Sequence, residues 1–372
     1  MNIRVTMDGI YFETQKHGGI SRMYQEILPR LCGADPSIRI SLFTKRALAQ
    51  PVPAGSCIDH FQIHSPERFL RPTRLFGRTY PLVRAVCAHP YLMRRRTSVW
   101  HSTYYTMPLS WDGPIVTTVY DLIHERFPNL FSSSSDEALR ARKRTSINSS
   151  SVIIAISEST KEDLTVYYGV SPERVKVIHL AAGSTFQEQL NDEVTLRERP
   201  YLLYVGSRGH YKNASLLLEA YARWHGNSDV DLLMVGPPPT SKEVTLVNDL
   251  LVAGRVGFIS DAGDRTLATM YRQAIALVYP SLYEGFGIPL VEAMSSGCPI
   301  IASRIPSSVE VAGDAAIYFD PDNGETLLQA LDQVMDTAAR QALAQRGRLR
   351  GESFSWEKAA RELALAYRLA QN

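Results

Sequence analysis

Short β-branched runs alternate with amphipathic stretches along nearly the whole chain, and this pattern constrains the fold more than any other feature. Several runs, such as 152–156 and 232–235, are apolar at every position, as strands covered on both faces of a sheet must be. Repeated alternation of this kind predicts an α/β protein with doubly wound parallel sheets. The predicted strands are 3–7, 38–43, 98–101, 115–120, 152–156, 175–179, 201–205, 232–235, 255–259, 275–279, 299–302 and 316–319. The predicted helices are 20–31, 136–149, 158–168, 214–224, 242–252, 265–272 and 356–370.

The alternation is interrupted between Ala182 and Pro200 by a polar, acidic stretch. A chain of 372 residues is long enough for two domains, so we interpret this stretch as the linker between two Rossmann-like domains. We expect the first domain to span 1–182 and the second to span 183–354. The last helix, within 355–372, carries a core-facing apolar stripe.

Composition and charge exclude several classes of protein. Lys and Arg number 40 and Asp and Glu 38, a net charge of +2, which argues against dedicated nucleic-acid binding. The cysteines are scattered without CxxC spacing, so neither a disulfide scaffold nor a structural metal site is expected. No apolar run approaches the roughly 20 residues of a membrane span. The start of the chain predicts a strand rather than a signal peptide, so we expect a cytoplasmic protein.

The most informative segment is 275–302, IALVYPSLYEGFGIPLVEAMSSGCPIIA. It predicts a strand, a loop rich in small residues, a short helix with Pro289 in its first turn and Gly297 at its end, and another strand. The loop therefore lies at the carboxyl end of a parallel strand, where open α/β sheets bind their ligands.

Two carboxylates are placed by this geometry, Glu284 in the loop and Glu292 near the first turn of the helix. Gly285 and Gly287 allow main-chain N–H groups to approach a ligand, and the helix N-terminus favours anions. A polyhydroxylated phosphate ester would suit such a site. Alternatively, the two glutamates only cap the helix and complement its dipole. Spacing by itself does not separate these two interpretations.

The Glu-x7-Glu pattern of Glu284 and Glu292 resembles the signature of retaining glycosyltransferases of family GT4. Further motifs at similar intervals extend the resemblance over most of the chain: 152–164, LLYVGSRGHYKN at 202–213, VEVAGDAAIYFDP at 309–321 and FSWEKAA at 354–360. The resemblance implies the GT-B fold, in which two Rossmann-like domains face a cleft. It implies that the first domain binds the acceptor, that the second binds the nucleotide sugar, and that the helix in 355–372 packs back on the first.

The resemblance also implies roles for individual residues. Glu284 would be catalytic and would bind hydroxyls of the donor sugar beside the amides of Gly285, Phe286 and Gly287, while Glu292 would bind the ribose. The amides of Gly18 and Gly19 would face the diphosphate, although a simple turn before a helix explains that pair equally.

The loop after strand 201–205 is expected to bind the donor diphosphate. Lys212 matches the diphosphate-binding lysine of the family. Relatives often have Arg immediately before that lysine, but this chain has Tyr211, so we assign the second cation to Arg208 and include its neighbour Ser207 in the donor site. Two cations that compensate the leaving diphosphate would allow a reaction without a metal or other cofactor.

In the first domain, VTTVYDLIHERFP at 116–128 resembles the segment where relatives often show His-Asp after a strand. Tyr120 replaces that histidine, Asp121 is retained, and His124 follows. We expect Asp121, as a catalytic residue, or His124 to touch the donor sugar or the acceptor; helix capping by Asp121 is an equal alternative. His101 is a weaker candidate for a sugar contact, and packing at the rim of the site is its alternative role.

Two Asp-x-Asp pairs imitate metal sites. Asp229 and Asp231 precede a strand instead of following one, and Asp320 and Asp322 lie in a turn sequence. We therefore expect no metal site at either pair.

The resemblance implies transfer of a sugar with retention of configuration, by front-face attack, and we expect the acceptor to be a glycan or lipid-linked glycan. The patterns QKHGGISR, VGSRGHYKN and VYDLIHE look closest to bacterial mannosyltransferases of surface polysaccharide and lipopolysaccharide assembly, which favours GDP-mannose as the donor. The alternatives are another GDP- or UDP-sugar, and a two-lobed sugar-binding protein without catalysis.

The even net charge conceals a basic segment. Between Arg68 and Arg96 there is no Asp or Glu, and apolar residues are interleaved with eight arginines. This pattern suits peripheral contact with an anionic inner-membrane leaflet, and a solvated arginine-rich helix face explains it equally. The arginines are Arg68, Arg71, Arg74, Arg78, Arg84, Arg94, Arg95 and Arg96.

Overall fold

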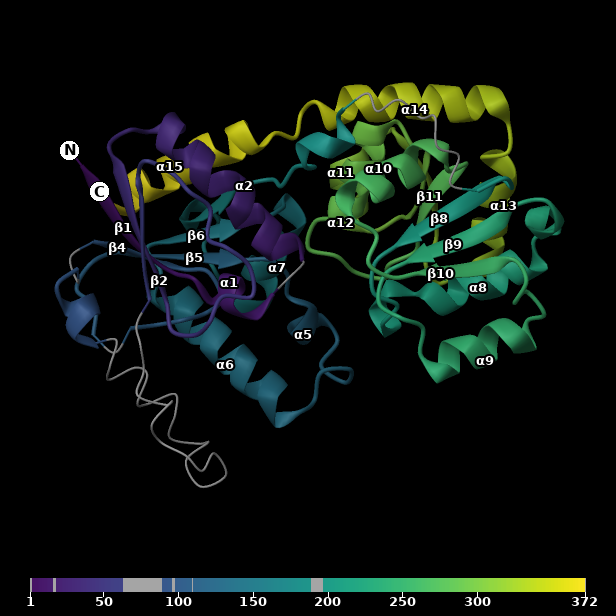
Figure 1. Ribbon diagram of the computed structural model, residues 1–372. Helices are drawn as coiled ribbons and strands as arrows, with labels where there is room; N and C mark the ends of the chain where they lie inside the picture. The colour runs from purple at the N-terminus through teal and green to yellow at the C-terminus, as the bar shows by residue number, and fades with distance from the viewer. Residues whose placement is uncertain are drawn as a thin grey trace. The chain divides into compact units, whose positions relative to one another are not determined.

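The computed structural model describes residues 2–15, 18–62, 89–95, 98–108, 110–188 and 197–371 (Figure 1). The chain forms two compact units. Unit 1 comprises Met1–Leu180 together with Trp356–Asn372, and unit 2 comprises Ala181–Ser355.

Among the described residues, unit 1 holds one parallel sheet in the order β3-β2-β1-β4-β5-β6-β7. The strand β6 is buried at all four positions, in agreement with its uninterrupted apolar sequence. The strands are β1 Ile3–Asp8, β2 Ile38–Thr44, β3 Ile58–Gln62, β4 Val99–Ser102, β5 Ile115–Val119, β6 Val152–Ala155 and β7 Val175–Val177.

Helices cover both faces of this sheet (Figure 1). The C-terminal helix α15 packs against α2 on one face, and Arg368 of α15 donates to the Asp35 carboxylate at the end of α2 over 2.9 Å. On the other face, α6 and α7 contribute Leu139, Ile147 and Leu164 to one apolar cluster. The helices are α1 Ile10–Thr14, α2 Gly19–Ala34, α5 Ile123–Arg126, α6 Ser134–Ser149, α7 Glu158–Tyr168 and α15 Trp356–Gln371.

Unit 2 contains a parallel sheet whose described strands follow the order β10-β9-β8-β11-β12-β13. Apolar side chains of α8, α9 and α13 cover one face, and α10, α11 and α14 lie on the other (Figure 1). The strands are β8 Tyr201–Val205, β9 Asp231–Val235, β10 Val256–Ile259, β11 Ala276–Tyr279, β12 Ile300–Ser303 and β13 Ala316–Phe319. The helices are α8 Ala214–Arg223, α9 Ser241–Asp249, α10 Asp264–Gln273, α11 Ile288–Ser296, α12 Pro306–Ala312, α13 Gly324–Gln333 and α14 Thr337–Gly351.

The predicted doubly wound parallel sheets are confirmed, and each predicted strand is present with small shifts at its ends. The strand β3 is an additional one that we did not predict. Its sequence, IDHFQ, alternates weakly, and its residues are mostly exposed because, among the described strands, β3 pairs with β2 alone at the sheet edge. A short half-exposed strand needs no apolar run, so the sequence carries little signal for it.

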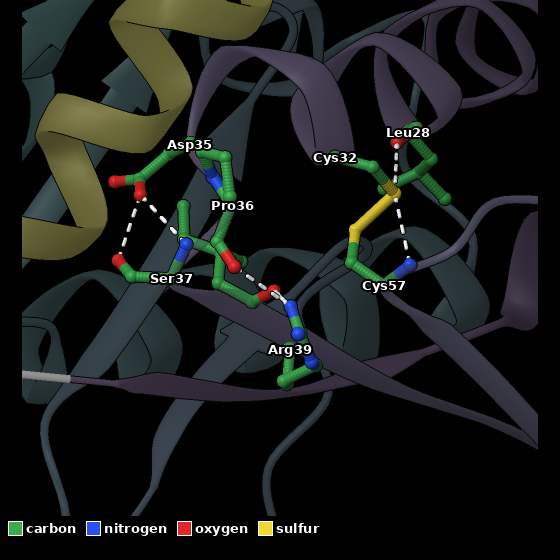
Figure 2. The surroundings of a disulfide bond; sticks show 8 residues. Leu28, Cys32, Asp35, Pro36, Ser37, Arg39 and Cys57 are labelled. Carbon is green, nitrogen blue, oxygen red and sulfur yellow. Dashed lines mark hydrogen bonds between the residues drawn. A yellow bond between two sulfur atoms is a disulfide. The ribbon is translucent and has the colours of Figure 1, made fainter.

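Formation of β3 brings Cys57 beside Cys32 at the C-terminal end of α2, and the two form a disulfide with Cα atoms 5.3 Å apart (Figure 2). The sequence analysis expected no disulfide scaffold and did not predict this single bridge. A sequence separation of 25 between Cys32 and Cys57 matches no recognisable motif, and the pairing of β3 with β2 brings the two cysteines together. Cys298, in unit 2, is a buried free thiol.

Candidate active site

The turn between β11 and α11 places Glu284 at the carboxyl edge of the sheet of unit 2. Gly287 has φ +110°, a conformation that a residue with a Cβ adopts only under strain, and Pro289 occupies the first turn of α11. Phe286 anchors the turn, because its buried ring packs edge-on against Phe354 with centroids 5.7 Å apart. These local features hold the carboxylate of Glu284 at the strand ends.

Glu284 is the centre of a polar cluster. Its Oε1 accepts hydrogen bonds from Lys212 Nζ and Ser281 Oγ, each at 2.6 Å. The side chains of Lys212 and Glu284 are 18% and 12% exposed, so this ion pair is mostly desolvated but still reachable. Burial and the neighbouring Glu284 carboxylate raise the pKa of Tyr279, which keeps its hydroxyl neutral as a donor beside the glutamate. The structure thus brings together Glu284 and Lys212, which lie 72 residues apart in sequence.

Lys212 reaches this cluster from the loop between β8 and α8. The loop is fastened to the β11–α11 turn by a main-chain bond from Leu282 N to Tyr211 O of 2.8 Å. Asn213 ends the loop in the left-handed conformation, and its amide donates to Pro321 O over 2.9 Å. Ser207, in the same loop, is exposed.

Arg208 lies in the same loop but is engaged elsewhere. Its Nε pairs with Glu243 at 2.7 Å, its Nη2 donates to Pro237 O, and its side chain is only 3% exposed. Although burial raises the pKa of the Glu243 carboxyl, bonds from Thr240 and Arg208 lower it overall. In this arrangement the guanidinium joins the β8–α8 loop to the start of α9.

Glu292 lies in α11 and is 5% exposed, and the Tyr271 hydroxyl donates to its Oε2 over 3.2 Å. Gly285, Phe286 and Gly287, which follow Glu284 in the turn before α11, are also buried. Asp231, half of one Asp-x-Asp pair, is the first residue of β9, at the opposite end of the strands from Glu284, and pairs with Arg199 at 3.1 Å.

In unit 1, Gly18 and Gly19 are exposed at the start of α2, where Gly18 O accepts from Arg22 N. Asp121 follows β5, and its Oδ1 accepts from Ile123 N over 3.2 Å at the start of α5. The N-cap of α5 is Leu122, so Asp121 closes a turn directly before the helix and does not cap it.

His124 lies in α5 with its side chain 17% exposed and its Nε2 3.6 Å from the Asp136 carboxylate. Burial, and then the nearby Lys143, lower the pKa of His124, which favours the neutral imidazole. Its Nδ1 is buried without a hydrogen-bond partner.

His101 does not face solvent. It is fully buried in β4, where Nδ1 bonds the Tyr367 hydroxyl at 2.6 Å and Nε2 bonds Thr118 Oγ1 at 2.9 Å. Burial lowers its pKa to about 3. A sugar contact by this side chain does not fit the structure, because both ring nitrogens are occupied inside the unit.

Tyr120, which stands where relatives often have histidine, also points inward. Its hydroxyl donates to Thr103 O over 2.9 Å and bonds the Tyr24 hydroxyl at 2.9 Å, and Tyr24 bonds Thr118. Tyr120 is 5% exposed. Its hydroxyl therefore continues the buried network of His101.

Asp8 is a functional candidate that the sequence analysis missed. It ends β1 and is 4% exposed, and its carboxylate accepts from Thr103 N at 2.8 Å and from the hydroxyls of Thr103 and Thr106. Burial raises the pKa of Asp8, and these bonds oppose the rise. The rule that singled out Asp121, an acidic residue directly after a buried strand, would also have found Asp8.

Most of the basic segment lies outside the described residues, including Arg68, Arg71, Arg74, Arg78, Arg84 and Arg96. Arg94 is exposed, whereas Arg95 is half-buried and stacks over the Phe61 ring at 4.9 Å. Among the described residues, no three His, Cys, Asp or Glu side chains gather as metal ligands. Likewise, no helix in the described part of the chain has the length and apolarity to cross a bilayer.

Two family models match consecutive parts of the chain. Residues 17–182 match Glycosyltransferase Family 4, and residues 186–350 match Glycosyl transferases group 1. Together with the two parallel sheets and the acidic–basic cluster at a strand edge, these matches define a glycosyltransferase of the GT-B fold. The chain belongs to the glycosyltransferase family that the two models describe, so the resemblance seen in its sequence is confirmed.

Known proteins resemble the chain over nearly its full length. The O-antigen chain mannosyltransferase B of Escherichia coli is 25% identical over 366 residues, 94% of this chain and 96% of that protein. WaaG, a glycosyltransferase involved in lipopolysaccharide biosynthesis, has a structure with a TM-score of 0.75 and 17% identity, covering 97% of this chain and 98% of WaaG. Anabaena Alr3699/HepE in complex with UDP and glucose gives a TM-score of 0.72 at 14% identity, with 98% of each chain covered.

Proposed function

We propose that this glycosyltransferase moves a sugar, with retention of configuration, from a nucleotide-diphosphate donor to a glycan or lipid-linked glycan. The observation that carries the proposal is the Lys212–Glu284–Ser281 cluster at the carboxyl edge of the second sheet. A carboxylate offers acceptors to sugar hydroxyls, and an ammonium group beside it offers a positive charge to a diphosphate. The solved structure of Alr3699/HepE, which resembles this chain in fold, contains UDP, and this supports a nucleotide-diphosphate sugar as the donor.

The proposal assigns a role to each residue of the donor site. Glu284 accepts from hydroxyls of the donor sugar, Glu292 accepts from the ribose, and the amides of 285–287 lie beside the sugar. Lys212, with Arg208 and Ser207, binds the diphosphate, and the proposal also assigns Gly18 and Gly19 of unit 1 to donor binding. Lys212 already forms its ion pair with Glu284, so both side chains are ordered before the donor arrives, which reduces the entropy lost on binding.

The reaction exchanges one bond for another at the anomeric carbon. The bond from this carbon to the diphosphate oxygen breaks, and a bond to the acceptor hydroxyl oxygen forms on the same face of the sugar. The acceptor proton passes to the departing diphosphate oxygen, so no protein nucleophile is needed. Positive charge from Lys212 stabilises the negative charge that develops on the diphosphate. The proposal includes no metal and no other cofactor.

We propose GDP-mannose as the donor and bacterial surface polysaccharide or lipopolysaccharide as the destination. The name of the Escherichia coli relative, an O-antigen chain mannosyltransferase, supports this choice.

The deciding experiment offers the enzyme GDP- and UDP-sugars with a lipid-linked glycan acceptor, with and without EDTA. We expect transfer from GDP-mannose, an α-linkage by NMR of the product, and no loss with EDTA. A β-linked product from an α-linked donor excludes retention, and loss of transfer in EDTA excludes metal independence. If the enzyme prefers another nucleotide sugar, the proposed donor is wrong but the proposed reaction stands. If a nucleotide sugar binds and no transfer follows, catalysis by this site is contradicted.

Unit 1 is proposed to bind the acceptor. Asp121 and His124 follow β5 at the carboxyl edge of its sheet and are only partly buried, so they can contact a sugar hydroxyl. Asp121 can hold the turn before α5 with Oδ1 and use Oδ2 for a substrate.

The basic 68–96 segment is proposed to bring a cytoplasmic enzyme to the anionic inner leaflet, where a lipid-linked acceptor would be found. Co-sedimentation with vesicles of anionic and of neutral lipid tests this. We expect binding to anionic vesicles that weakens with salt, and equal binding to neutral vesicles would contradict the proposal.

A further inference from the structure

Residues 120–126, here called the post-β5 segment, contain both proposed acceptor contacts, Asp121 and His124. The segment includes α5, which has only four residues and is too short to be rigid through its own hydrogen bonds. Its position therefore depends on contacts with neighbouring elements.

Lys143 of α6 makes the central contact with this segment. Its side chain is 2% exposed, and its Nζ donates to the Asp121 main-chain oxygen at 3.2 Å and to Glu125 Oε2 at 2.9 Å. The same ammonium lies 5.5 Å from the centroid of the Tyr105 ring. One buried side chain thus bonds to a residue before α5 and to a residue within it, and it also contacts the loop between β4 and β5.

Glu125 extends the contact to α7. Its Oε1 accepts from the Tyr168 hydroxyl at 2.6 Å, and its side chain is 8% exposed. The post-β5 segment is therefore held from α6 and α7 through buried polar bonds.

A buried ammonium is costly to desolvate, and an apolar side chain of similar length would fill the same space. What the lysine adds is a directed bond to the carbonyl of the residue that we propose contacts the sugar. We infer that Lys143 is a positioning residue, which holds the main chain at Asp121 so that its carboxylate meets the reacting sugar. This inference rests on the proposed role of Asp121.

Two variants separate positioning from stability. In Lys143→Met the main-chain bond is lost, and Glu125 is left as a buried charge without its cation. In the double variant Lys143→Met/Glu125→Gln the unpaired charge is also removed, so we expect the free energy of unfolding to return close to that of the wild type. We expect kcat to stay about 10- to 100-fold low in both variants, because a displacement of about 1 Å at a catalytic group costs this much.

Arg174 provides a matched control in the same unit. It also donates to main-chain oxygens, those of Ile147 and Ser150, at 3.1 and 2.6 Å. These oxygens lie at the end of α6, where the chain enters β6, away from the post-β5 segment. We expect Arg174→Met to lower stability and leave kcat of the folded enzyme unchanged.

The measurements are kcat, KM for donor and acceptor, and urea unfolding of the full-length enzyme, with Asp121→Asn alongside. We expect KM for the donor to stay within about twofold of wild type in every variant, since the proposed donor residues belong mainly to unit 2. If Asp121→Asn works at the wild-type rate, the proposed role of Asp121 is wrong and this inference falls with it. If Asp121→Asn is impaired but the Lys143→Met/Glu125→Gln enzyme has wild-type kcat, only the inference is overturned.

Discussion

The carboxyl edges of the two sheets are built from different chemistry. In unit 2 the edge is charged: Lys212 and Glu284 form a partly exposed ion pair contributed by two loops. In unit 1 the polar groups at the corresponding edge are mostly buried and bonded to one another, as in the contacts of Asp8 with Thr103 and of Tyr120 with Tyr24.

The difference shows how one fold separates two tasks. A desolvated but reachable ion pair can exchange partners with an anionic ligand, which suits a nucleotide diphosphate. A buried network of hydroxyls cannot be reached by a ligand, so it stabilises a fixed shape, and in our proposal the partly buried Asp121 and His124 make the contact instead. The following predictions test this division.

The largest effect is expected at Glu284. In Glu284→Gln the carboxylate that accepts sugar hydroxyls is replaced, and we expect kcat/KM to fall about 100- to 1,000-fold, as when one preorganised polar contact to a transition state is removed. Glu325→Gln is the control, because that glutamate forms an exposed ion pair with Arg223 in the same unit. Steady-state kinetics give kcat/KM for both variants. An equal fall in kcat/KM for Glu284→Gln and Glu325→Gln would show that the Lys212–Glu284–Ser281 cluster has no special role in the reaction.

The Cys32–Cys57 disulfide is expected to stabilise unit 1 by about 3 kcal/mol, because it closes a loop of 25 residues in the unfolded chain. Hydrogen exchange of Cys32→Ser/Cys57→Ser should show the loss in β1 and β2 and leave β8 and β11 protected. A reductant should weaken the wild-type protein and leave the double variant unchanged. Equal loss in both sheets would contradict separate stabilisation of unit 1.

His101 makes the stability of unit 1 depend on pH. Burial lowers its pKa from 6.5 to about 3 in the folded protein, so below pH 6.5 only the unfolded chain binds the proton. Stability is therefore lost as the pH falls. Between pH 7.5 and 5 we expect the wild type to lose about 2 kcal/mol more than His101→Gln, as measured by urea unfolding. The matched control is His225→Gln, whose imidazole is 84% exposed and should show no such difference.

The smallest effect is expected at Lys212. Removal of its ammonium in Lys212→Met should weaken binding of the nucleoside diphosphate about tenfold, since the main-chain amides of the proposed donor site remain. Calorimetric titration measures this, with Arg223→Met, the other member of the exposed control pair, for comparison. Unchanged affinity would mean that Lys212 serves only to orient Glu284.

The parallel sheets and the position of the Glu284 loop could be predicted from sequence for definite physical reasons, whereas the roles of the two glutamates were implied by the family resemblance. A strand buried on both faces must be apolar throughout, as at β6, and a ligand loop at a strand end needs small residues such as Gly287. These are local requirements, so the sequence shows them directly. Residues that act through distant partners leave no such pattern. In the sequence, Lys143 cannot be distinguished from other cations on an amphipathic helix, and Cys32 and Cys57 show no spacing that indicates a disulfide.

The sequence alone determined the class of fold and the succession of strands and helices along the chain, and its resemblance to family GT4 supplied the candidates Glu284, Glu292, Lys212 and Asp121. The tertiary structure decided which of the candidates meet. It placed Lys212 against Glu284, turned Arg208 toward Glu243, buried His101 and Tyr120, and joined Cys32 to Cys57. The physical reason is that periodicity and turn chemistry act between neighbours in sequence, whereas ion pairs, burial and disulfides depend on loops that approach only after the sheets have formed.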